Sequence, residues 1–142
     1  MARKPAPRRT AGRGTVPEVI VDFVFDRGLL FVAVRNLGAA PAHDVRVEFG
    51  APLLGLEGTK DVSGMPLFGD LSFLPPGKEI ATFLDTAESF FRSGQPTRVS
   101  TRISSRDAGG GRRVATIRHN LEIYRDIGYV SRPDGDAIAP AR

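Results

Sequence analysis

The sequence predicts an all-β fold: a sandwich of two antiparallel sheets with about seven strands and one short inserted helix. From residue 16 onward, apolar and polar residues alternate, which is the period of a strand with one buried face. Gly, Pro, Asn and Asp interrupt this alternation at short intervals, as turns between antiparallel strands do. No strand–helix–strand alternation, the pattern of a parallel sheet, is present. A small barrel is the alternative architecture.

Three strands are expected in the first part of the chain. The first covers residues 18–26 and the second residues 29–36, joined by a turn at 26–28 in which glycine supplies the positive φ of a tight hairpin. The third covers residues 45–49 and follows a loop with Pro41, which cannot donate a ladder hydrogen bond. The side chains expected to face inward are Val19, Val21, Phe23, Phe25, Leu30, Val32, Val34, Val45, Val47 and Phe49.

Less regular segments follow. Residues 50–70 form an excursion rich in Gly and Pro that also carries many apolar residues. Short strands are expected at 71–74 and 79–84, on either side of a Pro-Pro-Gly turn, and the last hairpin pairs 98–106 with 113–124.

One helix is expected. In Asp85-Thr86-Ala87-Glu88, an N-cap residue precedes a glutamate by three positions, which is the pattern of a capping box with Asp85 as the cap. The pattern predicts a helix over residues 86–93, which Gly94 ends.

The positive charge lies mainly near the N-terminus. The chain has a net charge of +4, but residues 1–15 hold five of the 20 basic residues and none of the 16 acidic ones. The basic residues of this segment are Arg3, Lys4, Arg8, Arg9 and Arg13. The segment is also poor in apolar residues, so we expect a disordered arm over 1–15, a domain over 16–130 and a flexible tail over 131–142. The arm is either a weak anchor for phosphates or an acidic partner, or a solubilising terminus.

Composition excludes several kinds of chemistry. The chain has no cysteine, so disulfides, cysteine-ligated metals and thiol catalysis are excluded. Only His43 and His119 are present, the former beside Asp44, and no nucleophile motif accompanies them. We therefore expect no enzyme, no cofactor and no metal site. The acidic residues do not cluster but lie singly at turns and strand edges. A calcium site shared between loops stays open as an alternative.

Location follows from what the sequence lacks. There is no apolar run of about 18 residues, so we expect no membrane span. Arg8-Arg9 is similar to part of a twin-arginine export signal, but acidic residues interrupt the apolar stretch after it. We expect a cytoplasmic protein.

Four segments carry a resemblance to a known family. Asn36-Leu37-Gly38, Ala40-Pro41, Val45-Arg46-Val47 and Leu74-Pro75-Pro76-Gly77 resemble the turns and strands of bacterial immunoglobulin-like modules related to the CARDB type. The resemblance extends over residues 19–120. It implies an immunoglobulin-like sandwich with a non-catalytic spacer, adhesion or recognition role, and it assigns no functional residues. The excursion over 50–70 and the helix after residue 85 depart from the usual module.

The leading functional hypothesis is a module that binds a protein partner or takes part in assembly. The expected binding elements are the loop 50–70, the helix 86–93 or a free sheet edge, which can add a partner's strand. The apolar residues expected to bind are Leu53, Leu54, Leu56, Met65, Leu67, Phe68, Phe90 and Phe91. The alternative for these side chains is that they cap one end of the sandwich.

The second hypothesis is a nucleic-acid-associated accessory protein. It would use the basic arm as a tether and a stripe formed by Arg98, Arg102 and Arg106, which lie on one face if residues 98–106 form a strand. The alternative for the stripe is an ordinary solvated face.

Overall fold

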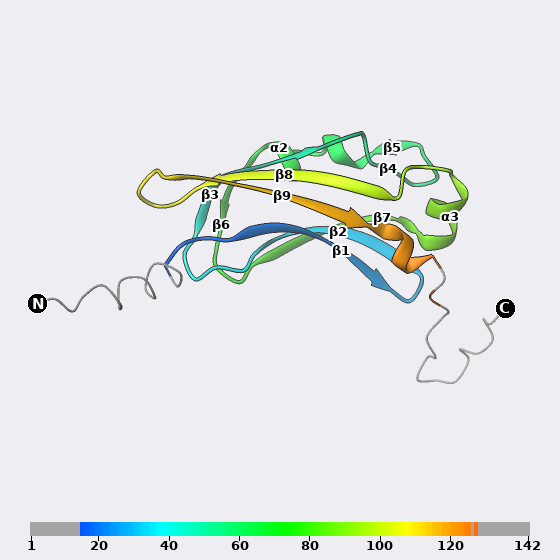
Figure 1. Cartoon of the computed structure of the whole chain (residues 1–142), viewed down its shortest axis with the longest axis horizontal. Helices are drawn as coiled ribbons and strands as arrows, with labels where there is room; N and C mark the ends of the chain where they lie inside the picture. Colours follow the sequence, from blue (N-terminus) through cyan, green and yellow to red (C-terminus); the bar gives the residue numbers. More distant parts are fainter. Residues whose placement is uncertain (1–14, 126, 128–142) are drawn as a thin grey trace, which may run out of the picture.

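The protein folds into two stacked β-sheets (Figure 1). A computed structural model of the chain describes residues 15–125 and 127. All neighbouring strands are antiparallel. One sheet has the order β1-β2-β7, formed by β1 (Val19–Asp26), β2 (Leu29–Asn36) and β7 (Glu79–Thr86). The other has the order β6-β3-β8-β9, formed by β6 (Leu71–Leu74), β3 (Ala42–Phe49), β8 (Arg98–Arg106) and β9 (Arg112–Asn120). The predicted all-β sandwich is confirmed. The arm predicted over 1–15, apart from Thr15, and the tail predicted over 131–142 lie outside the described residues.

Each sheet contains one local hairpin. In the β1–β2 hairpin, Asp26 pairs with Leu29, and both loop residues, Arg27 (φ 52°) and Gly28 (φ 85°), have positive φ. This two-residue turn matches the twist of the strands, so the predicted hairpin is confirmed. In the β8–β9 hairpin, the carboxylate of Asp107 accepts hydrogen bonds from loop amides, which hold the turn together.

The core lies between the sheets and is made of the alternating side chains. Eight of the ten side chains expected to face inward from the first three strands are buried, and the other two, Phe25 and Phe49, are half-buried against them. From the second sheet, Val99, Ile103 and Leu74 complete the apolar interior. Period-two alternation therefore predicted the buried face of each of these strands.

Asn36 ties three segments to one another. Its Nδ2 donates to the carbonyl oxygens of Ala40 at 2.9 Å and Leu74 at 3.1 Å, and its Oδ1 accepts from the amides of Glu18 at 3.1 Å and Gly38 at 2.9 Å. The side chain is buried, and all four of its hydrogen-bonding positions are used. It therefore joins the entry to β1, the β2–β3 loop and the end of β6.

The excursion over residues 50–70 bridges the two sheets. Its elements are β4 (Leu54–Gly55), β5 (Lys60–Asp61), the 3₁₀ helix η1 (Val62–Gly64) and α2 (Pro66–Gly69). The α2 helix packs on β3 and the β4 strand packs on β7, so each sheet receives one part of the excursion. A Cβ on Gly55 would overlap the carbonyl oxygen of Leu84, so only glycine allows this close approach.

The helix α3 (Ala87–Arg92) is present, but the predicted capping box is wrong. The N-cap is Thr86, whose hydroxyl accepts from the amide of Ser89 at 3.1 Å. Asp85 is instead the last inward residue of β7, where its carboxylate accepts from the amides of Glu57 at 2.9 Å and Thr86 at 2.8 Å. The strand continues two residues further than expected and takes Asp85 with it. Gly94 follows the helix with φ of 78°, so the predicted end is confirmed.

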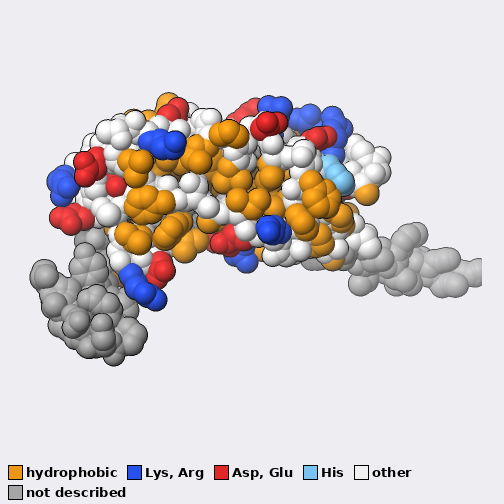
Figure 2. Space-filling view, turned by 180° about the vertical axis from the view of Figure 1, so that it is seen from behind, with side chains coloured by type: hydrophobic (Ala, Val, Ile, Leu, Met, Phe, Trp, Pro, Cys, Tyr) orange, Lys and Arg blue, Asp and Glu red, His pale blue; other side chains and the backbone are white. Residues whose placement is uncertain are grey.

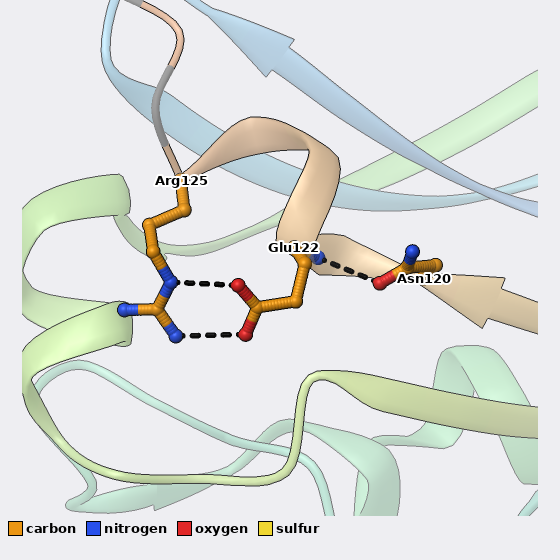
Figure 3. A network of polar contacts seen from close by, with 3 residues as sticks. All are labelled: Asn120, Glu122 and Arg125. Atoms are coloured by element: carbon orange, nitrogen blue, oxygen red, sulfur yellow. Dashed lines mark hydrogen bonds and ion pairs between the residues drawn. The ribbon is translucent and has the colours of Figure 1, made fainter.

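The last strand ends earlier than expected. β9 stops at Asn120, and residues Leu121–Tyr124 form the 3₁₀ helix η2, so the expectation of a strand to residue 124 is wrong. The physical reason is local: the Asn120 side chain accepts from the amide of Glu122 at 3.0 Å and starts the helical turn (Figure 3). Two hydrogen bonds from Arg125 to the Glu122 carboxylate, at 2.7 and 2.8 Å, follow this turn.

Candidate functional site

Three of the eight apolar residues expected to bind a partner are buried, and three others pack against the core from half-buried positions. Leu53, Phe68 and Phe90 are buried in the core, so the expectation that they form a binding surface is wrong. Phe68 and Phe90 are buried because α2 packs on β3 and α3 packs on β7. Leu54, Met65, Leu67 and Phe91 are half-buried. Leu56 alone of the eight is exposed, at 42%.

Half-buried apolar side chains are visible on the side of the molecule opposite β1 and β9. Figure 2 shows them as a band along the middle of this side, with charged side chains around it. Met65, Leu71 and Ile80 are partly buried and pack against the core. They fill the space between the edges of the two sheets, as residues that close a sandwich do.

The outer face of the β6-β3-β8-β9 sheet is strongly basic. Arg98, Arg102 and Arg106 are all exposed on the outward side of β8, so the predicted stripe exists as a geometric feature. Neighbouring strands add three more arginines to the same face. By strand register, Arg46 lies opposite Ser104, Arg112 opposite Arg106, and Arg118 opposite Ser100.

Few acidic groups balance these six arginines. The 18 residues of β8 and β9 contain six arginines, counting Arg113, and no Asp or Glu. Among the described residues, only Arg102 of the six arginines on the outer face forms an ion pair, with Glu48 at 3.8 Å. Arg106 donates instead to the carbonyl oxygen of Gly110 at 3.2 Å. Arg98 interacts electrostatically with Glu122, and Asp44 lines a pocket with Arg46, Arg106 and Arg112. The six arginines outnumber these acidic groups, so the face favours an anionic ligand.

An aromatic pair lies at one end of this face. His43 pairs in register with Arg106 on one side and Phe73 on the other, and the rings of His43 and Phe73 are 5.3 Å apart. Phe73 is 49% exposed. Together with Arg112, these residues form a row that crosses all four strands.

A β-bulge explains why sequence analysis missed this row. The register of β3 shifts between His43 and Arg46, and Asp44 within the shift has φ of 50°. The extra residue places His43 on the outer face, although simple alternation from Val45 and Val47 would have placed it inside. A non-glycine residue with positive φ is not visible in the sequence.

Comparison with known proteins gives one match. Residues 2–125 match the model of a family described as a domain of unknown function, DUF8453. The chain belongs to the DUF8453 family. Neither a search of curated proteins nor a search of solved structures found a match.

A groove separates the free edges of the two sheets in this DUF8453 domain. β1 and β9 lie on the same side of the sandwich and diverge toward the β8–β9 loop (Figure 1). The groove between them has a volume of about 960 Å³. Its lining residues include Val16, Pro17, Val19, Leu37, Ile103, Ser105, Arg113 and Ala115. At the other end the edges meet, because Tyr124 donates its hydroxyl hydrogen to the carbonyl oxygen of Phe23 at 3.2 Å.

Gly38 shapes one wall of the groove. A Cβ at this position would overlap backbone atoms of Val16 and Pro17, so the β2–β3 loop can lie against the entry to β1 only because residue 38 is glycine.

His119 contacts a hydroxyl group and an aromatic ring. Nε2 of His119 is 3.1 Å from the hydroxyl of Thr101, and its ring packs edge-on against Phe23 at 4.9 Å. Burial lowers the pKa of His119 below its ordinary value, and the charge of Asp22 opposes this shift. Within the described part of the chain, no three His, Asp or Glu side chains gather closely enough to hold a metal.

The arm residues expected to contact nucleic acid, Arg3, Lys4, Arg8, Arg9 and Arg13, lie outside the described residues. The part of the chain that the structure describes contains no helix with the length and apolar character needed to span a membrane.

Proposed function

We propose that the outer face of the β6-β3-β8-β9 sheet of this DUF8453 domain binds single-stranded nucleic acid. The observation that carries the proposal is the gathering of six arginines from three strands on one face, against a single ion pair with Glu48 in the described chain. Guanidinium groups bind phosphate oxygens through two parallel hydrogen bonds, and such contacts dominate the affinity of proteins for nucleic acids.

The aromatic pair supports a single strand over a duplex. Proteins that bind single strands combine a basic surface with exposed rings on which bases stack. Phe73 and His43 offer such a ring pair at the end of the arginine face, next to Arg106 and Arg112. A base stacked there would be followed by phosphates along β8, whose three arginines are spaced four residues, or roughly 13 Å, apart.

The test is a binding titration of the full chain with a fluorescent single-stranded oligonucleotide. We expect the variant Arg46→Ser/Arg112→Ser/Arg118→Ser to weaken binding at least tenfold and to flatten its salt dependence, by about 0.7 in the log–log slope for each arginine–phosphate interaction that the substitutions remove. Phe73→Ser should weaken binding by about tenfold with little change in that slope, since stacking releases no counterions. Arg92→Ser, on the exposed surface of α3, is the matched control.

A variant of the full chain with serine at the five basic positions of residues 1–15 distinguishes binding by the arm from binding by the sheet. Binding that disappears in this variant but survives in the triple arginine variant would contradict the proposal, because the arm alone would then carry the interaction.

The second candidate function is that of a non-catalytic module that binds a protein partner, as the sequence first indicated. The groove between β1 and β9 supports it, since free strand edges offer unpaired backbone donors and acceptors to another chain.

We also propose an immunoglobulin-like relationship, supported by the division into three and four strands and by the position of Asn36 at the turn that carries the resemblance. We propose in addition that the protein is located in the cytoplasm.

Affinity capture from nuclease-treated lysate separates the two candidates. Proteins that are retained at moderate salt by both the full chain and the arm variant favour the second function. Capture that is lost with nuclease favours the first, because it depends on the nucleic acid.

A further inference from the structure

The edge strand β9 has one unpaired side. It pairs with β8 alone, so alternate residues at its start direct their amide and carbonyl groups away from the sheet. In the described residues, no strand covers the stretch from Arg112 to Ala115, which lines the groove. An incoming strand can pair there without displacing any strand of the fold.

The floor of the groove contains a buried polar group without a described partner. Ser105 is 4% exposed and lines the groove beside Ile103, which is also buried. Its hydroxyl makes no hydrogen bond to any other described residue, although buried polar groups almost always have a partner. Val19 and Ala115, which also line the groove, would contact apolar side chains of a bound segment.

The charged residues that line the groove favour a ligand with negative charge. Arg112 and Arg113 are neighbours at the start of β9, and neighbouring strand residues point to opposite faces. Neither forms an ion pair with a described residue, and both line the groove. Glu18 is the one acidic residue among the lining residues. A segment with two adjacent carboxylates could therefore meet both arginines, one on each face of the added strand.

We propose that the groove binds an extended peptide segment that pairs with β9, with apolar side chains opposite Ala115 and two adjacent acidic residues opposite Arg112 and Arg113. This inference deepens the second candidate function; it shares Arg112 with the proposed nucleic-acid face, while Val16–Val19, Ser105 and Arg113 belong to the groove alone. The paired length is short, about four or five residues or roughly 15 Å, because β1 and β9 meet again near Phe23 and His119, whose rings are 4.9 Å apart.

The experiment uses the full chain labelled with ¹⁵N and three short valine-rich peptides. One carries two adjacent aspartates at its carboxyl end, as antiparallel pairing with β9 requires, and the others carry two lysines or two serines in their place. We expect the aspartate peptide to shift the amide signals of Val16–Val19, Ser105 and Arg112–Ala115. Its dissociation constant should be at least tenfold below that of the lysine peptide, since the charge contacts carry the discrimination.

A charge reversal provides the decisive variant. Arg113→Glu, at an exposed position, should lose the aspartate peptide and gain the lysine peptide. Arg92→Ser should bind all three peptides as the wild type does. Equal affinity for the three peptides, or shifts outside the groove only, would overturn the inference.

A single-stranded oligonucleotide tests independence from the first function. It should shift the amides of Arg46 and Arg102 on the outer face and leave those of Val16–Val19 unchanged. If it shifts the amides of Val16–Val19 and Ser105, the groove is part of the nucleic-acid surface and the inference is wrong. Failure of the oligonucleotide to bind at all would overturn the proposed function while the peptide result stands.

Discussion

The side-chain amide of Asn36 donates to the carbonyl oxygen of Leu74 across 3.1 Å, joining β2 to the end of a strand in the other sheet. The two residues are 38 positions apart, and both are buried. This contact is one of four that the same side chain makes. The side chain therefore fixes the corner at which the first strand, the β2–β3 loop and β6 come together.

We predict that Asn36→Ala destabilises the domain by about 3 kcal/mol. Loss of the side chain leaves buried carbonyl and amide groups without partners, and each such group costs on the order of 1 kcal/mol or more. Urea denaturation monitored by circular dichroism measures the change. Leu37→Ala, at an exposed neighbouring position, is the control and should change stability by less than about 1 kcal/mol.

Val47→Asp should unfold the domain. Val47 is 6% exposed and faces the core from the centre of β3, so the substitution buries a carboxylate at a cost of several kcal/mol. Glu48→Gln, one position away on the outer face, removes only an exposed ion pair and should change stability by about 0.5 kcal/mol. Thermal melting of both variants tests the strand register, and equal melting temperatures would contradict it.

Asp85→Ala should destabilise the domain more than Thr86→Ala. Thr86 is the N-cap of α3, and removing such a cap costs about 1 kcal/mol. Asp85 is 3% exposed and accepts two backbone hydrogen bonds, so its removal should cost about 2 to 3 kcal/mol. Denaturant unfolding of both variants gives the order. The reverse order would mean that the two backbone hydrogen bonds of Asp85 stabilise the domain less than the Thr86 cap does.

Stability should fall as the pH decreases through about 6.5, and His119 should cause part of the fall. Burial depresses the pKa of His119, so below its ordinary value the unfolded chain binds a proton more readily than the folded chain. The loss of stability should level off once the pH is below the folded pKa. His119→Gln should flatten the dependence between about pH 8 and pH 5.

Unfolding free energies measured at several pH values test this prediction. The pKa of Glu122 is held at about 2, chiefly by its hydrogen bonds with Arg125, so its main effect lies at more acidic pH. An unchanged pH dependence in His119→Gln would assign the effect to another group.

The sequence predicted those features that depend on local alternation and turn chemistry. The β1–β2 hairpin follows from a two-residue turn with glycine, and the buried faces follow from alternation. The prediction of the capping box failed because Asp85 and Thr86 are adjacent and both can cap a helix. Asp85 is buried at the end of β7, so Thr86 is the cap. The prediction of where β9 ends failed because Ile123 continues the apolar alternation of the strand into a 3₁₀ turn.

The candidate sites were less accessible to sequence analysis. The three arginines of β8 follow from period-two spacing, but the addition of Arg46 depends on strand pairing, which single-sequence patterns do not contain. The exposed position of His43 depends on the bulge at Asp44. The groove depends on the divergence of two edges that are far apart in the sequence.

The order of the strands has a consequence for how this domain acquires its fold. Within the two large sheets of the described chain, only the β1–β2 and β8–β9 hairpins join strands through short turns, and they lie near the two ends of the described residues. Every pairing of β3 with β8, or of β2 with β7, must close a long loop first, which slows folding to milliseconds or longer. During synthesis on the ribosome, the first hairpin emerges well before the strands that cover it. Its apolar face, with Val21, Phe23 and Val32, is therefore exposed until β8 and β9 arrive.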